Sequence, residues 1–350
     1  MRTFTGLDDR LRTVPAPVVR SLATIERGAG RAQLFARQLP MLVEQLAHRA
    51  RIESVRASSA IEQVIVPDAR LRALVDRGQA PRTRPEAELA GYRDALDFVL
   101  RSSDTASPLT TAYLLRLHRF LWAHTDSVGG RLKEADNRVV DRDPDGWRVD
   151  RFRTVPARDT LFYVSELHDR LEAAFTAEEH HPVLLTAAYA LDLLVIHPFD
   201  NGNGRLARLA TTALLLRSGF DVVRYVPVEG LIDRTSDRYY QSLKASTEGW
   251  HDASHDVWPW FGYLAERLAE AYEVFERNAG AAMPAGSKQA RVRAVVASRL
   301  EPTFSFDEIR AALPGVSDAT IRITLQRLRD EGAVEALGQG RGARWRRVEG

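Results

Sequence analysis

Residues 197–208 read His-Pro-Phe-Asp-Asn-Gly-Asn-Gly-Arg-Leu-Ala-Arg and lie between two apolar segments. The preceding segment, 182–196, and the following one, 206–217, each have the composition of a buried helix. A Gly-Asn-Gly turn at the start of a helix directs several backbone N–H groups outward, and the helix dipole adds partial positive charge there. The stretch therefore predicts a helix–loop–helix unit whose loop binds an anion.

The side chains of this stretch are of the kinds that phosphate chemistry uses. Arg205 and Arg208 are three residues apart and share one face of the first helical turns, where they would neutralise bound phosphates. His197 titrates near neutrality and can accept a proton from an attacking hydroxyl group. Asp200 and Asn201 offer side-chain oxygens of the kind that hold Mg²⁺ beside phosphates. Each feature alone is common, but chance produces the eight fixed positions together on the order of once in 10⁸ chains.

The composition over 350 residues is that of an ordinary soluble protein: 45% hydrophobic, 27% charged, with a formal net charge of +2. The absence of cysteine excludes disulfides, thiolate metal sites and cysteine nucleophiles. The N-terminal residues lack the apolar core of a signal peptide, and the longest apolar stretch is shorter than the roughly 20 residues that span a bilayer. We therefore expect a cytoplasmic protein with no membrane partner.

Helical periodicity dominates the rest of the chain up to about residue 277. One region differs: residues 137–154 contain two β-compatible stretches around the turn sequence Asp-Pro-Asp-Gly at 143–146, which predicts a hairpin. The stretches with apolar residues at three- and four-residue intervals, each predicted to be a helix, are 34–51, 86–100, 110–122, 160–175 and 256–275.

The C-terminal part has a different organisation. Residues 278–290 are rich in small residues, Gly and Pro and predict a linker. Beyond it, helices at 306–313 and from Ser317 or Asp318 to about 330, then strands at 332–337 and 343–348, follow the layout of a winged helix. Residues 291–350 hold 11 arginines, no lysine and 8 acidic residues. Seven of these arginines lie on the second helix or the wing, which fits either DNA contact or protein docking: Arg322, Arg327, Arg329, Arg341, Arg344, Arg346 and Arg347.

The central stretch resembles the motif H-P-F-x-[D/E]-G-N-G-R-x-x-R of the Fic (filamentation induced by cAMP) family. The resemblance implies an all-α Fic-type core with a β-hairpin flap, here followed by a small α/β winged-helix domain. It implies transfer of AMP from Mg-ATP to a Ser, Thr or Tyr hydroxyl of a protein, with His197 as the base. The implied phosphate contacts are the anion loop of Gly202, Asn203 and Gly204, with Arg205 on the β-phosphate and Arg208 on the γ-phosphate, and Phe199 anchors the loop.

The resemblance extends over roughly residues 40–275. The stretch 114–119, followed by Gly129, Gly130 and Lys133, is similar to the family's sequence before the flap. Residues 137–154 would be the flap, whose edge pairs with an extended segment of the target protein. The stretch 238–243 resembles the family's Tyr-Tyr segment, which places Tyr239 and Tyr240 near the adenine.

The sequence departs from the family motif at the metal ligand. The acidic residue of the motif aligns with Asn201, and the acid stands one place earlier, at Asp200. An amide oxygen coordinates Mg²⁺ without adding charge, so weaker metal binding is expected unless Asp200 substitutes for it.

Residues 56–63 resemble the family's inhibitory helix, S/T-x-x-x-E-[G/N]. Ser58 and Glu62 are four residues apart and share a helix face, whereas Gln63 stands where Gly or Asn is expected. The resemblance implies that Glu62 pairs with Arg208 and blocks productive ATP binding. The predicted parts are thus residues 1–105 with the inhibitory helix, the catalytic core at 106–277, the linker at 278–290 and the winged helix at 291–350.

Two functions from different classes follow. The first is an autoinhibited AMP transferase that uses ATP and Mg²⁺, with the protein substrate bound along residues 137–154. The second is a nucleotide-sensing regulator that binds DNA through the winged helix and transfers nothing. Removal of AMP by the same site, other transfers known in the family, self-modification and a homodimer stay open.

Overall fold

The computed structural model describes residues 1–102, 109–142, 148–282, 288–298, 302–313, 315–338 and 344–348. The chain forms two compact units. The first contains residues 1–29 and 46–273, and the second contains residues 30–45 and 274–350. Each unit has its own hydrophobic core.

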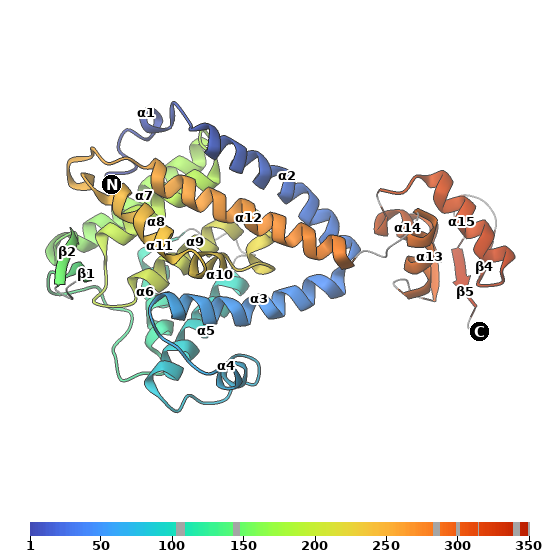
Figure 1. The fold of residues 1–350 in the computed structure, drawn as a ribbon, viewed down its shortest axis with the longest axis horizontal. Helices are drawn as coiled ribbons and strands as arrows, with labels where there is room; N and C mark the ends of the chain where they lie inside the picture. The colour runs from blue at the N-terminus through green and yellow to red at the C-terminus, as the bar shows by residue number, and fades with distance from the viewer. Residues whose placement is uncertain are drawn as a thin grey trace. The chain divides into compact units, whose positions relative to one another are not determined.

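Helices make up most of the first unit (Figure 1). Its centre is the antiparallel pair α8 (Pro182–Ile196) and α9 (Asn203–Arg217), whose residues are nearly all buried. α8 is apolar on every side, as expected of a helix with no face toward water. α7 and α11 pack against α8, and α5 and α6 pack against α9. The other helices up to residue 282 are α1 (Leu7–Leu11), α2 (Ala16–Gln38), α3 (Pro40–Ile61), α4 (Asp68–Val75), α5 (Arg84–Ser102), α6 (Thr111–Trp122), α7 (Thr160–Ala177), α10 (Val228–Asp233), α11 (Ser236–Thr247) and α12 (Trp258–Ala282). Parts of α2, α3 and α12 belong to the second unit.

Local sequence accounts for several of the helix ends. Thr110 precedes α6, and its side chain accepts a hydrogen bond from the Tyr113 N–H, as an N-cap does. The predicted helix over 34–51 is wrong in one respect, because α2 ends at Gln38 and α3 begins at Pro40. Proline lacks a backbone N–H and restricts the residue before it, so it starts a helix rather than continuing one. α9 begins at Asn203, three residues before the predicted start.

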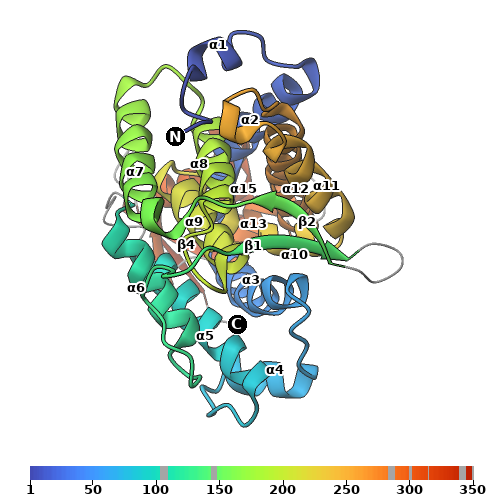
Figure 2. The same cartoon turned by 90° about the vertical axis from the view of Figure 1, so that its left-hand side faces the viewer.

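The predicted hairpin is present as an antiparallel pair, β1 (Arg138–Arg142) and β2 (Arg148–Arg153). Figure 2 shows the two strands side by side. Val139 pairs with Phe152, and the register shifts by a bulge between Val139 and Val140. The predicted turn at 143–146 lies outside the described residues.

The second unit contains helices and a small sheet. They are α13 (Lys288–Ser298), β3 (Thr303–Ser305), α14 (Phe306–Ala312), α15 (Asp318–Asp330), β4 (Val334–Leu337) and β5 (Arg344–Arg347). The sheet is antiparallel with the order β3-β5-β4, and the sequence did not predict β3. Ser305 forms a capping box with Glu308 at the start of α14, and Ser317 caps α15. The side chains of Val292, Phe304, Ile309 and Ile321 are among those that form the core.

The division of the chain differs from the predicted boundaries. The linker predicted at 278–290 is helical at both ends, because α12 extends to Ala282 and α13 begins at Lys288. Residues 283–287 lie outside the described part. The first unit spans the boundary predicted at 105/106, since α5 packs against α6 and α9. Among the described helices, none combines the length and apolar character needed to cross a bilayer.

Candidate functional site

The loop between α8 and α9 has a compact backbone set by two left-handed residues. His197 ends α8 with φ 50° and ψ 61°, and its N–H donates to the Leu193 carbonyl at 3.0 Å. Gly202 precedes α9 with φ 82°, a conformation that glycine adopts without the steric cost of a Cβ. The two turns bring His197 back over the N-terminus of α9, where unpaired backbone N–H groups and the helix dipole favour an anion.

Two buried side chains hold the middle of the loop in place. Phe199 is fully buried and stacks on His118 of α6, with ring centroids 3.8 Å apart. Asn203 uses its amide on the loop itself: its Nδ2 donates to the Phe199 carbonyl at 2.7 Å, and its Oδ1 accepts from the Phe199 N–H at 3.0 Å. The Asn203 side chain is therefore occupied by the loop's own backbone.

His118 ties the same loop to the segment after α6. Its Nδ1 accepts from the Gly130 N–H at 2.9 Å, and its Nε2 lies 2.9 Å from Trp122 Nε1 and 3.1 Å from the Asn201 carbonyl oxygen. Burial lowers the pKa of His118 to about 4, so the ring is neutral at pH 7. Its contacts with the loop and its neutral state make His118 a structural support of the site.

A buried lysine connects the loop to the base of the hairpin. Lys133 Nζ donates to the Ile196 carbonyl at 3.0 Å, to Asn137 Oδ1 at 2.9 Å and to Thr154 Oγ1 at 3.3 Å. Asn137 Nδ2 in turn donates to the Phe199 carbonyl at 2.9 Å. Burial lowers the pKa of Lys133 to about 8. The two ends of the hairpin are thus fixed to the loop that carries His197.

His197 is oriented and protonated as a base requires. A carbonyl oxygen only accepts, so the 3.2 Å contact between Nδ1 and the Leu194 carbonyl places the proton on Nδ1. Nε2 then carries a lone pair that no hydrogen bond engages within the described residues. Burial lowers the pKa of His197 to about 4, and nearby Lys133 acts in the same direction. The imidazole is therefore neutral at pH 7 and able to accept a proton at Nε2.

Arg208 lies on α9, one turn beyond Gly204, and its guanidinium group is almost fully buried. Its Nε donates to Ser58 Oγ at 2.9 Å, and its Nη2 donates to the Ser58 carbonyl at 2.9 Å and to Glu62 Oε1 at 2.8 Å. Burial disfavours the charge of Arg208, but the neighbouring Glu62 holds its pKa above the ordinary value. The structure therefore brings Arg208 together with Ser58 and Glu62, which lie about 150 residues earlier in the chain.

Arg208 Nη1 has no hydrogen-bond partner in the described part of the chain, although it is buried. A buried guanidinium N–H without a partner is costly, so an additional acceptor is expected at this position.

The Glu62 carboxylate lies against the N-terminus of α9. A Cβ built on Gly204 would overlap Glu62 Oε1 and would stand 3.3 Å from Arg208 Nη1. Glycine at 204 thus leaves room for the Glu62 carboxylate, which lies at the end of a flexible side chain. Because backbone N–H groups and Arg208 converge here, Glu62 occupies a position that suits any anion.

Gln63 explains how α3 ends at this position. The Val64 N–H donates to the Ser59 carbonyl and the Gln63 N–H to the Ala60 carbonyl, which is a Schellman motif. Gln63 has φ 61°, a conformation that favours Gly or Asn. The preference for Gly or Asn at this position of the inhibitory motif therefore has a backbone reason, and Gln63 adopts the same conformation at some cost.

A cleft of about 620 Å³, including solvent at its mouth, collects these groups. Its polar end has Glu62, His197 and Arg208, with Gly204 at its floor. Its apolar walls come from the hairpin, through Val139 and Phe152, and from α8 and α11. The remaining lining residues are Leu194, Tyr239, Tyr240, Leu243 and Thr247.

Tyr239 and Tyr240 both line the cleft, but they differ in burial. Tyr239 is 3% exposed and packs edge-on against Trp260. The Tyr240 hydroxyl donates to the Ile61 carbonyl at 3.1 Å, at the end of the helix that carries Ser58. Tyr240 therefore connects α11 to α3, a contact that the sequence did not predict.

Arg205 is not among the residues that line this cleft, and its contact with the β-phosphate stays a prediction. Its Nη1 lies 3.0 Å from Glu88 Oε2 on α5, and its guanidinium carbon is 5.0 Å from the centroid of the Trp122 ring. With 5% of its side chain exposed, Arg205 joins α9 to α5 and α6. Residues three apart on a helix are separated by about 300° around its axis. Arg205 and Arg208 therefore lie on the same side of α9 but contact different neighbours.

Asp200 and Asn201 are exposed in the loop between α8 and α9. One carboxylate and one amide oxygen form a donor set that fits Mg²⁺, which binds through one or two carboxylates together with substrate phosphates and water. Elsewhere in the described residues, Asp8, Glu179 and His180 bring three metal-ligating atoms within 4.8 Å of one another, away from this loop in sequence.

The supporting residues of the site were harder to find than the motif. The stretch that contains His118 and Lys133 was recognised by its resemblance, but the roles of these residues in holding the loop were not predicted. Asn137 was placed only as the start of the hairpin. A buried Lys or His among apolar residues is the available signal, and it does not reveal a partner that is distant in the chain.

Comparison with known proteins agrees with this geometry. Residues 108–215 match the Fic/DOC family. A Protein adenylyltransferase Fic of Nematostella vectensis is 27% identical over 247 residues, which cover 68% of this chain and 52% of that protein. Its namesake in Drosophila willistoni is 26% identical over 189 residues, 54% of this chain and 33% of that protein. The chain thus spans about a third to a half of the length of these curated relatives.

Solved structures show the same fold. A Fic family protein from Desulfovibrio desulfuricans G20 has a TM-score of 0.63 at 22% identity, with 97% of this chain and 98% of that chain covered. Fic-1 of C. elegans (residues 134–508) has a TM-score of 0.58 at 21% identity, with 75% and 72% covered. Residues 108–215 of the chain thus match the Fic/DOC family, and the fold is that of the Fic family structures.

Proposed function

We propose that the protein is an adenylyltransferase that moves AMP from ATP to a hydroxyl side chain of a protein. One observation carries the proposal: a neutral imidazole with a free Nε2 opens onto the same cleft as a buried arginine that has an unpaired N–H group. The names of the curated relatives support this activity.

The residues of the cleft have defined parts in this reaction. Nε2 of His197 accepts the proton of the target hydroxyl, whose oxygen forms a bond to the α-phosphorus of ATP. The bond between the α-phosphorus and the bridging oxygen breaks, and pyrophosphate leaves with the bonding electrons. The products are an AMP ester of the protein and pyrophosphate, with the proton on His197 passing afterwards to solvent.

The phosphates are bound by the start of α9 and by Arg208. The backbone N–H groups of residues 202–204 meet the α- and β-phosphates, and Arg208 holds the γ-phosphate in place of Glu62. Arg205 is proposed for the β-phosphate, and in the structure it pairs with Glu88. Asp200 and Asn201 would hold Mg²⁺, which supplies charge neutralisation of the phosphates when bound.

Glu62 is proposed to inhibit this reaction. Its carboxylate is an internal anion at the position of the γ-phosphate, bound to Arg208 and lying over Gly204. ATP must displace it, so the apparent affinity for ATP is reduced by the stability of the Glu62–Arg208 pair.

The hairpin and the second unit are assigned roles in partner binding. We interpret β1 and β2 as the flap, along which an extended segment of the target protein adds as a strand. We interpret residues 288–348 as a winged helix. Arg322 and Arg329 of α15 are 69% and 49% exposed, which supports a surface for DNA phosphates. The compartment proposed for this activity is the cytoplasm.

Labelled ATP tests the proposal. With [α-³²P]ATP and Mg²⁺, the Glu62→Gly variant is expected to label protein covalently, and the additional change His197→Ala is expected to remove the label. [γ-³²P]ATP is expected to leave no label, because the γ-phosphate departs with pyrophosphate. Label from the γ-phosphate, or label that persists without His197, would overturn the assignment. Release of AMP from a modified target in the absence of pyrophosphate would instead identify removal of AMP by hydrolysis at the same site.

A further inference from the structure

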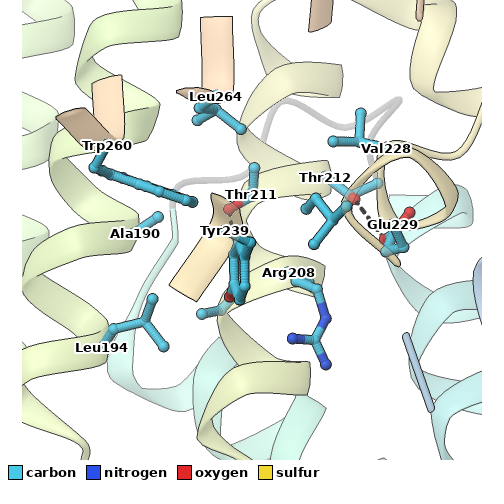
Figure 3. Close-up of a pocket in the computed structure, with 12 residues that line it drawn as sticks. Ala190, Leu194, Arg208, Thr211, Thr212, Val228, Glu229, Tyr239, Trp260 and Leu264 are labelled. Atoms are coloured by element: carbon cyan, nitrogen blue, oxygen red, sulfur yellow. Dashed lines mark hydrogen bonds between the residues drawn. The ribbon is translucent and has the colours of Figure 1, made fainter. Parts of the chain in front are cut away.

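A second cavity, of about 350 Å³, shares Arg208, Tyr239 and Leu194 with the cleft. Most of its wall is apolar, from side chains such as Val228, Ile232, Trp260 and Leu264. Figure 3 shows Arg208 and Glu229 on the side of this cavity opposite Trp260. The cavity thus brings an acidic side chain close behind the arginine that faces the cleft.

Glu229 is a buried carboxylate that neutral groups hold in place. It is 3% exposed, at the start of α10. Its Oε1 accepts from the Tyr92 hydroxyl of α5 at 3.1 Å and from the Thr212 hydroxyl of α9 at 3.3 Å. Burial raises the pKa of Glu229, and the charge of Arg208 acts to lower it. Within the described residues no ion pair compensates the Glu229 carboxylate directly.

Arg208 also has a buried N–H group without a hydrogen-bond partner among the described residues. Glu62 and Ser58 use its Nε and Nη2, whereas Nη1 has no partner among the described side chains. A buried charge that loses its only ion-pair partner is strongly destabilised. If Glu62 were the only counter-ion, its departure would favour withdrawal of the guanidinium from the site. Glu229 lines the same cavity, and the charge of Arg208 favours its ionised form.

The carboxylates of Glu62 and Glu229 differ in how easily they can leave Arg208. Glu62 lies just after the end of α3 and is 34% exposed, so water can receive it when it leaves. Glu229 is tied to α5 and α9 and has almost no exposed surface. One partner of Arg208 is therefore exchangeable, and the other is fixed.

We propose that Glu229 is a positioning residue that keeps the Arg208 guanidinium aimed at the cleft when a γ-phosphate replaces Glu62. This inference rests on the proposed function of Arg208 in binding the γ-phosphate. Its consequence is specific: Glu229 favours ligands with a third phosphate over those with two, and contributes little to proton transfer at His197.

The test compares nucleotide binding in the Glu62→Gly background. The dissociation constants of ADP and of an ATP analogue with a methylene group between the α- and β-phosphates are measured by calorimetry. Glu229→Gln keeps the shape and one acceptor oxygen but removes the charge. It is expected to reduce the preference for the triphosphate on the order of tenfold. The KM for ATP rises accordingly, while kcat at saturating ATP changes less than about twofold.

Asp192→Asn is the matched control. Asp192 is also a fully buried carboxylate with neutral donors, Thr3 and Trp250, but it lines neither cavity. It is expected to lower stability without changing the preference for the triphosphate. Equal effects of Glu229→Gln and Asp192→Asn on that preference would overturn the inference and leave Glu229 a structural residue.

Other outcomes also test whether Glu229 positions Arg208. If Glu229→Gln does not fold, Tyr92→Phe, which removes one hydrogen bond to the carboxylate, is expected to reduce the preference about threefold. No change in that variant would overturn the inference. If Glu229→Gln reduces the preference for the triphosphate but the protein transfers no AMP, the inference is supported and the proposed function is refuted. If the Glu62→Gly protein binds neither nucleotide, both are wrong.

Discussion

Replacing Glu62 by glycine should release the nucleotide site, and the structure gives the expected size of the effect. Glu62 Oε1 lies 2.8 Å from Arg208 Nη2, with 4% of the arginine side chain and 34% of the glutamate side chain exposed. A hydrogen bond between charged groups contributes about 1.5–3 kcal/mol. Partial exposure of Glu62 reduces this to about 1–2 kcal/mol. Since about 1.4 kcal/mol corresponds to a factor of ten, ATP affinity should rise about 5- to 30-fold.

Calorimetry with a non-transferable ATP analogue and Mg²⁺ measures this change directly. Glu53→Gln is the matched control, because Glu53 lies on the same helix and pairs with Arg56, away from the cleft. The control should bind the analogue as the wild type does. AMP incorporation at subsaturating ATP should rise with the affinity. If Glu62→Gly binds the analogue within twofold of both the wild type and the control, the carboxylate does not compete with the γ-phosphate.

Three further predictions concern Gln63, the metal ligand and the buried histidines. Gln63→Gly should raise the free energy of unfolding by about 0.5–1 kcal/mol in urea titration, because glycine adopts the left-handed conformation of residue 63 without strain; an unchanged or lower value would contradict this. Asn201→Asp should lower the Mg²⁺ concentration for half-maximal activity about tenfold by adding a charged ligand, and no change would place the metal elsewhere. The free energy of unfolding should fall as pH falls from about 6.5 toward 4. Unfolding restores an ordinary pKa to the buried histidines, so the unfolded state binds more protons than the folded state in this range. Urea titrations at about pH 7, 5.5 and 4.5 measure this free energy, and a value that does not change with pH would refute the prediction. The histidines whose pKa burial lowers to about 4 are His118, His168, His197 and His255.

Local patterns in the sequence were enough to predict the helical core around the motif. The apolar run before His197 has no polar face, and the Gly-Asn-Gly turn marks the start of the next helix, so α8, the loop and α9 follow from neighbouring residues. The hairpin at 138–153 and the caps Thr110 and Ser317 are likewise local features. The break at Leu39 was missed because apolar periodicity continues through it, although Pro40 marks it.

Side-chain roles that depend on distant neighbours were not predictable in this way. The ion pair of Arg205 with Glu88, more than a hundred residues earlier in the chain, was not predicted. Nothing near Asn203 indicates that its amide is used by Phe199. Glu62 and Arg208 were connected through the family resemblance, since no rule of spacing joins residues so far apart. Burial and tertiary pairing decide these roles, and both arise only when the helices pack.

Binding of the triphosphate by the loop and Arg208 is the claim on which the other assignments depend. A crystal of the Glu62→Gly protein soaked with Mg²⁺ and a non-transferable ATP analogue tests it most directly. We expect density for the phosphates over residues 202–204, the terminal phosphate on Arg208, and His197 Nε2 facing the α-phosphate. A structure with the nucleotide bound elsewhere, or with these backbone N–H groups vacant at saturating nucleotide, would contradict the account.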